Sequence, residues 1–150
     1  MSEERRQISF GYLSDKADFE KSTLIPAEGR KNLKKGNYYL FIFIPGEVIL
    51  KLSIFPCETN NIKKILIRLK EFSPDLVKGI SDVLKNCNLG DSTIHTTGLC
   101  FSGVNCFYET YIDATKMTTK NIDLEQIKTD FKKVPRVEDV QIMNVELKKL

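Results

Sequence analysis

The sequence is poor in the residues that most often perform catalysis or bind metal ions. It contains a single histidine, His95, and no tryptophan, and none of its four cysteines forms a CxxC pair. The usual zinc-binding and thioredoxin-like spacings are therefore absent. No Ser-His-Asp order, glycine-rich phosphate loop or pair of acids on one helix face occurs either. We expect no enzyme, no catalytic residue, no cofactor and no metal site.

Long apolar segments are also missing. No apolar run reaches membrane-spanning length, and the start, MSEERRQ, lacks the apolar core of a secretory signal. We therefore expect a cytoplasmic protein with no membrane partner. In a reducing cytoplasm, cysteines most often behave as small buried apolar residues or as loop thiols. We expect this of Cys100 and Cys106, although the two could face one another across a hairpin, and redox or metal sensing is the alternative.

The charges nearly balance. The net charge is +3, with 29% charged and 41% hydrophobic residues, which is ordinary for a globular protein and only compatible with nucleic acid. Contact with DNA would therefore require a local cluster of basic residues. One cluster is present, to which Arg5 and Arg6 could add: Lys21, Arg30, Lys31, Lys34 and Lys35.

The chain after residue 61 alternates between strand and helix patterns. Residues 62–72 are rich in aliphatic residues with partial alternation, which indicates a strand. Ser73-Pro74-Asp75 then provides an N-cap, a proline at the first helical position and an early acid, and apolar residues at helical spacing continue to Cys87.

A hairpin follows over residues 92–101 and 105–114, with its turn at residues 102–105. Asp123 can cap a second helix that Pro135 ends, and residues 137–147 form the last strand. This order predicts a ferredoxin-like βαββαβ domain, an antiparallel four-stranded sheet with both helices on one face. A second subunit or the N-terminal segment must cover the other face. Glu109 could pair with His95 on the facing strand, depending on the register.

The N-terminal part has a different pattern, and the polar segment 58–62 separates the two. We expect strands at residues 7–13 and 22–25, a short helix at residues 27–33, and a hairpin turning at Pro45-Gly46. Residues 38–44 are apolar at every position, which indicates a strand buried on both faces. About sixty residues form a marginal core, so interlocking with a second copy would complete it.

The segment KKVPRVEDVQIMNV, residues 132–145, resembles the closing helix, corner and edge strand of the ACT domain family. That family comprises regulatory modules that dimerise and bind amino acids or other small ligands. The resemblance covers most of residues 62–147 and implies a small-molecule effector such as an amino acid. It places ligand contacts at the start of the first helix and, from the loop after it, in a dimer: Ser73, Asp75, Leu76, Asn88 and Leu89.

Residues 21–55 resemble the swapped-hairpin family of AbrB-like and MazE-like regulators. The resemblance rests on Leu24-Ile25-Pro26, on Arg30 and Leu33, on Gly36-Asn37, and on the hairpin 41–52. In that family two chains interlace into one small barrel, and basic residues on its loops contact DNA. Lys21-Ser22 stands where the family commonly has a Gly-Arg pair.

Together these features predict an α+β protein with a small N-terminal β-barrel or swapped hairpin at residues 1–57 and a ferredoxin-like, ACT-like domain at residues 62–150. The function that follows is a DNA-binding transcription regulator that senses a small molecule. The alternative is an oligomeric ligand-binding or scaffold protein that does not bind DNA. Both hypotheses expect a homo-oligomer, either a dimer or a tetramer.

Overall fold

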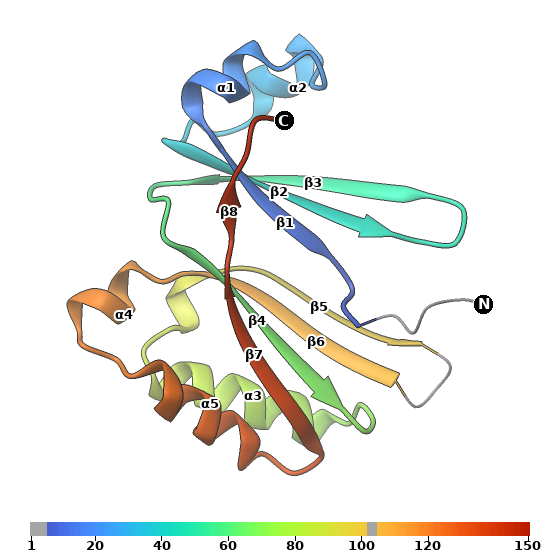
Figure 1. Ribbon diagram of the computed structural model, residues 1–150, viewed down its shortest axis with the longest axis vertical. Helices are drawn as coiled ribbons and strands as arrows, with labels where there is room; N and C mark the ends of the chain where they lie inside the picture. Colours follow the sequence, from blue (N-terminus) through green and yellow to red (C-terminus); the bar gives the residue numbers. More distant parts are fainter. Residues whose placement is uncertain (1–5, 102–104) are drawn as a thin grey trace. The chain divides into compact units, whose positions relative to one another are not determined.

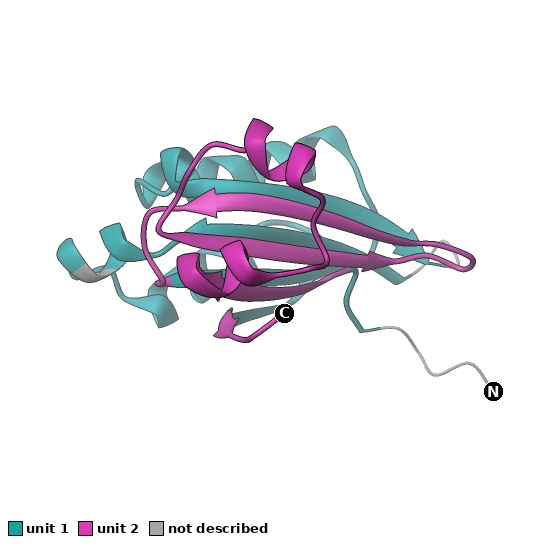
Figure 2. Cartoon of the chain, turned by 90° about the horizontal axis from the view of Figure 1, so that it is seen from above, with its two compact units in different colours: residues 1–8, 62–144 teal, residues 9–61, 145–150 magenta. Residues whose placement is uncertain are grey.

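The computed structural model describes residues 6–101 and 105–150, and the chain forms two compact units (Figure 2). Unit 1 comprises the residues up to Ile8 together with Ile62–Asn144, and unit 2 comprises Ser9–Asn61 together with Val145–Leu150. The junction between residues 61 and 62 lies at the end of the polar segment expected to separate two domains. A single cut of the sequence at this junction would assign both ends of the chain wrongly. The N-terminal residues up to Ile8 belong with the later segment in unit 1, and Val145–Leu150 belongs with the earlier segment in unit 2.

Unit 1 is a sheet with helices on one face (Figure 1). Its sheet has the order β5-β6-β4-β7, and every neighbouring pair is antiparallel. The mixed α+β class expected from the sequence is therefore confirmed. The elements in chain order are β4 (Ile62–Leu69), α3 (Pro74–Asn86), the 3-10 helix η1 (Gly90–Ser92), β5 (Thr93–Phe101), β6 (Asn105–Asp113), α4 (Thr115–Thr119), α5 (Leu124–Lys132) and β7 (Val137–Asn144).

Helix α3 begins where its capping residues predict. The Ser73 hydroxyl accepts a hydrogen bond from the Leu76 backbone N–H at 3.2 Å, and Pro74 occupies the first turn. Leu76, Ile80 and Leu84 are buried on one face of the helix, in a core shared with strands β4 and β6. A Cβ atom added at Gly79 would lie 2.8 Å from a Val134 methyl group, so the glycine permits close packing beside the end of α5.

Unit 2 is an open four-stranded sheet with the order β3-β2-β1-β8. Its elements are β1 (Phe10–Asp15), α1 (Lys16–Lys21), α2 (Ala27–Asn32), β2 (Tyr38–Pro45), β3 (Leu50–Cys57) and β8 (Glu146–Leu147). Strand β1 pairs antiparallel with β2 and parallel with β8. Within the described chain this sheet does not close into the small barrel expected from the sequence, because β8 occupies the free edge of β1.

Two further expectations about strands need correction. Residues 22–25 form no strand, because Ser22 ends α1 and Pro26 precedes the first residue of α2. The strand expected over residues 137–147 is broken at Val145, so β7 joins the sheet of unit 1 and β8 joins the sheet of unit 2.

The core of unit 2 is aromatic. The rings of Phe19 on α1 and Tyr39 on β2 stack with centroids 3.7 Å apart, and Phe41 meets Phe19 edge-on at 6.2 Å. Four successive residues of β2, from Tyr39 to Ile42, are buried, which is the burial on both faces that their unbroken apolar run predicts. In the described part of the chain, no helix is both long and apolar enough to cross a membrane.

Candidate functional site

The basic residues singled out in the sequence lie around α1 and α2 of unit 2. Lys21 ends α1, Arg30 and Lys31 lie in α2, and Lys34 and Lys35 lie in the loop that leads to β2. We call these five residues the basic corner. Its four lysines are exposed, whereas Arg30 is partly buried and donates a hydrogen bond from Nη1 to the Glu20 carbonyl oxygen at 2.6 Å. That bond holds α2 against the end of α1.

Local interactions fix the backbone of the basic corner. The Asp15 side chain caps α1 by accepting from the Asp18 N–H at 2.8 Å, and Phe19 anchors the same helix on Tyr39. Ile25 and Leu33, on either side of α2, pack against this aromatic cluster. Arg6 belongs to unit 1 and so does not join the basic corner within its unit, and Arg5 lies outside the described residues.

The residues expected to contact a ligand lie at two ends of α3. Ser73, Asp75 and Leu76 are at its start, while Asn88 and Leu89 follow its end. At about 1.5 Å per residue, this 13-residue helix keeps the two groups roughly 20 Å apart within one chain. The structure therefore does not bring these five residues together in a single site of one chain.

Several of these side chains are already engaged. The Ser73 hydroxyl caps α3 and also accepts from Arg136 Nη1 at 3.1 Å, while Leu76 and Leu89 are buried in the core. Asp75 is exposed in the first turn. Asn88 is exposed with a left-handed φ of 57° and borders a shallow cavity of about 200 Å³ that Lys85, Lys116 and Lys120 also line.

A second group of polar residues lies on the face of the unit 1 sheet that points away from α3 and α5. Side chains alternate along a strand, so Lys64, Leu66 and Arg68 of β4 share this face. The register places them opposite Tyr111, Glu109 and Phe107 of β6, respectively. The residues between them, such as Ile65 and Ile67, face the helices. We call this surface the helix-free face.

A buried ion pair occupies the centre of the helix-free face. Lys64 Nζ lies 3.1 Å from Glu109 Oε1, and their side chains are 4% and 0% exposed. The Lys64 ammonium also donates to Gln7 Oε1 at 2.9 Å, and the Ile8 backbone N–H donates to Glu109 Oε2 at 2.6 Å. Burial lowers the pKa of Lys64, and the charge and hydrogen bond of Glu109 oppose that shift. The ion pair thus fastens the N-terminal segment onto the face that either this segment or a second subunit was expected to cover.

His95 lies beside this pair, but the register of β5 and β6 does not place it directly opposite Glu109. It is opposite Tyr111, whereas Glu109 is opposite Thr97 and pairs with Lys64. His95 Nε2 and Thr97 Oγ1 are 2.8 Å apart, and burial lowers the pKa of His95. Among residues 6–101 and 105–150, no three His, Cys, Asp or Glu side chains are grouped so that they could hold a metal ion.

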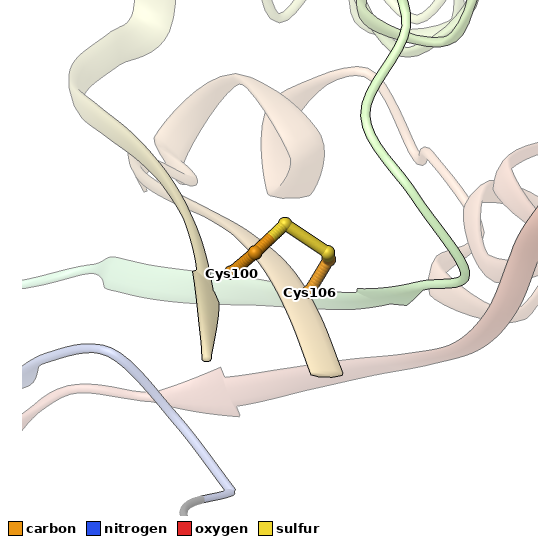
Figure 3. The surroundings of a disulfide bond; sticks show 2 residues. All are labelled: Cys100 and Cys106. Carbon is orange, nitrogen blue, oxygen red and sulfur yellow. A yellow bond between two sulfur atoms is a disulfide. The ribbon is translucent and has the colours of Figure 1, made fainter. Parts of the chain in front are cut away.

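Cys100 and Cys106 form a disulfide (Figure 3). They are directly opposite each other on β5 and β6, with Cα atoms 4.0 Å apart, and the turn between them (residues 102–104) lies outside the described residues. The expectation of unpaired thiols is therefore wrong for this pair, because the register brings the two cysteines face to face. Disulfides are rare in a reducing cytoplasm. This disulfide therefore gives no support to a cytoplasmic location, which stays a prediction.

No protein-family model matches the chain, and no curated protein matches its sequence.

Proposed function

We propose that the protein is a homo-oligomeric transcription regulator that contacts DNA through unit 2 and senses a small molecule through unit 1. The observation that carries this proposal is the basic corner. Lys21, Lys31, Lys34 and Lys35 are exposed beside Arg30, and residues 30–37 contain no acid. Lysines that neutralise phosphates displace condensed counterions, which gives affinity for DNA of any sequence. The likeness of residues 21–55 to swapped-hairpin regulators supports the same role.

The β2–β3 hairpin supports an assembly of two copies. Strand β3 is an edge of the unit 2 sheet, and apolar side chains at and after the turn are exposed: Val48 (93%), Ile49 (57%), Leu50 (63%) and Leu52 (37%). Unpaired backbone groups beside exposed apolar side chains favour pairing with another strand. We propose the same hairpin of a second copy as that partner. Two copies would carry two basic corners and so double the number of phosphate contacts.

The antiparallel order β5-β6-β4-β7, with α3 and α5 on one face, supports a ferredoxin-like, ACT-like sensor role for unit 1. One observation favours the second candidate, an oligomeric ligand-binding or scaffold protein without DNA contact. Arg30 is the arginine of the basic corner, and its guanidinium binds the Glu20 carbonyl within the unit. Lysine ammonium groups alone do not make the two-pronged contacts that arginine makes with phosphate.

A charge-reversal experiment distinguishes the two candidates. Lys34→Glu with Lys35→Glu reverses two exposed charges of the basic corner, and Lys132→Glu with Lys133→Glu makes the same change at exposed positions of unit 1. Fluorescence anisotropy with random duplex DNA at low salt measures the affinity of each variant. DNA contact through the corner predicts a loss of about tenfold or more for the first pair and a much smaller loss for the second. Equal affinities would favour the second candidate.

A further inference from the structure

A cavity of about 290 Å³ lies on the helix-free face of unit 1, beside the buried ion pair. Its lining includes Arg6, Leu66, Arg68, Phe107, Asp139 and Gln141. Strand pairing fixes most of this arrangement: Arg68 is opposite Phe107 on one side and Asp139 on the other, while Leu66 is opposite Gln141. The cavity therefore combines two arginines, the carboxylate of Asp139, the neutral amide of Gln141 and two apolar side chains in one small space.

The buried ion pair accounts for the position of Arg6. Glu109 accepts from the Ile8 N–H at 2.6 Å, and Gln7 accepts from Lys64 at 2.9 Å, so the two residues that follow Arg6 are held on the sheet. A buried ion pair loses the hydration of both charges, so it is weak evidence for a purely stabilising role. Anchoring the N-terminal segment gives Lys64 and Glu109 a positioning role at this cavity.

Arg68 is the second cation of the cavity. Its Nε lies 3.4 Å from Glu138 Oε2, and the Arg68 side chain is 51% exposed. An exposed pair of this kind contributes little free energy, and this one engages Arg68 through Nε. Guanidinium groups present planar N–H donors that match carboxylate and phosphate oxygens.

We propose that this cavity binds a small organic anion, a carboxylate or a phosphate monoester with an apolar or aromatic body. Arg6 and Arg68 bind the anionic group, and Leu66 and Phe107 contact the body. The volume lies just below the usual range for ligand pockets, which limits the body to about one ring. Asp139, beside Arg68, repels a second negative group on that side. The inference rests on the proposed sensing role of unit 1 and is independent of DNA contact.

Isothermal titration calorimetry of the full chain, without DNA, tests the ligand class. Phenyl phosphate is the probe, and phenylacetate tests whether a carboxylate replaces the phosphate. We expect saturable binding of both, with inorganic phosphate and benzyl alcohol each binding at least about tenfold more weakly, because each lacks one half of the recognised chemistry. Binding of only one of the two anionic probes would assign the ligand to that class. No saturable binding of either, or equal binding of inorganic phosphate or benzyl alcohol, would overturn the proposal.

Three variants test the location. Arg68→Gln and Arg6→Gln should each raise the Kd of the bound probe about tenfold or more. Arg136→Gln is the matched control, since Arg136 is also about half exposed and also pairs with a glutamate, Glu71. Circular dichroism melts verify that each variant folds, and Arg6, near the start of the chain, provides a second test if Arg68→Gln unfolds.

Loss of binding in Arg136→Gln, with Arg68→Gln and Arg6→Gln unaffected, would place the anion at the start of α3 and overturn this site. Failure here would leave the DNA proposal standing, because the anisotropy experiment uses no small ligand. Failure of DNA binding would likewise leave the calorimetry unchanged.

Discussion

Lys64 and Glu109 illustrate how two side chains on neighbouring strands depend on each other. Each side chain is almost completely buried, so removing either one would leave the other as a buried charge without a counter-charge. Glu109→Gln should lower the free energy of unfolding by about 3–5 kcal/mol, because Lys64 would then be buried without a counter-charge. Urea denaturation followed by circular dichroism measures the change.

Glu125→Gln provides the control for that experiment. Glu125 pairs with Lys128 at 3.6 Å on the surface of α5, where its side chain is 81% exposed. The same chemical change there should alter the free energy of unfolding by less than about 0.5 kcal/mol. A small, equal effect at both positions would show that the buried pair is not a structural necessity.

His95 gives a prediction about pH. Burial lowers its pKa, so the folded chain favours the neutral imidazole and the unfolded chain binds more protons just below pH 6.5. The stability that His95 contributes is therefore complete above pH 6.5 and is lost as pH falls towards the lowered pKa. His95→Gln should reduce the drop in urea midpoint between about pH 7.5 and about pH 5.5. An identical drop in both proteins would refute the assignment to His95.

At the scale of the elements, the disulfide joins the ends of β5 and β6. It closes a short loop, with a sequence separation of 6 residues, so restricting the unfolded chain should contribute roughly 2 kcal/mol. Dithiothreitol should lower the urea midpoint of the wild-type protein. The variant with Cys100→Ala and Cys106→Ala should have a low midpoint that does not respond to the reductant. If fully reduced wild-type protein kept the urea midpoint of the oxidised protein, the disulfide would have no stabilising role.

Elements with local signals were predicted well from the sequence. Ser73 and Pro74 themselves set the start of α3, and the unbroken apolar run of β2 predicts that this strand is buried. Strand β8 carries no such signal. Its two residues adopt strand structure because they pair with Tyr12 and Leu13, which are far away in the sequence. The position of the strand break at Val145 follows from that distant pairing.

Several contacts at the candidate sites also depend on residues far away in the sequence. Alternation along β4 places Lys64 and Arg68 on one face, but the partners of these side chains depend on the register with β6 and on the course of the N-terminal segment. Arg6 was grouped with the basic corner because of its charge, whereas the structure places it beside Arg68 in unit 1. The face-to-face position of Cys100 and Cys106 also depended on register.

At the scale of the whole molecule, the proposed regulator contains more than one copy of the chain. Leu50→Lys with Leu52→Lys puts charge on the exposed edge strand β3 and should convert the oligomer to a monomer in light scattering, because charged edges resist strand pairing. Val77→Lys, at an apolar position of α3 that is 40% exposed, is the control and should keep the wild-type mass. A wild-type protein that is already monomeric at working concentration would contradict the proposed assembly.

Assembly and sensing come together in the proposed regulator. If an anion bound to unit 1 alters the affinity for DNA, DNA must alter the affinity for the anion by the same factor. Binding at the cavity beside Arg68 and binding at the basic corner would then be thermodynamically coupled. The coupling free energy could be measured by titrating DNA with and without the anion, or the anion with and without DNA.

The most direct test of the central claim is the salt dependence of DNA affinity, measured by fluorescence anisotropy of a random duplex titrated with wild-type protein. Contact through the exposed lysines of the basic corner predicts binding at low salt that weakens steeply as salt is added, in proportion to the phosphates neutralised. Absence of binding at low salt, or an affinity that salt leaves unchanged, would contradict the claim that this protein is a DNA-contacting regulator.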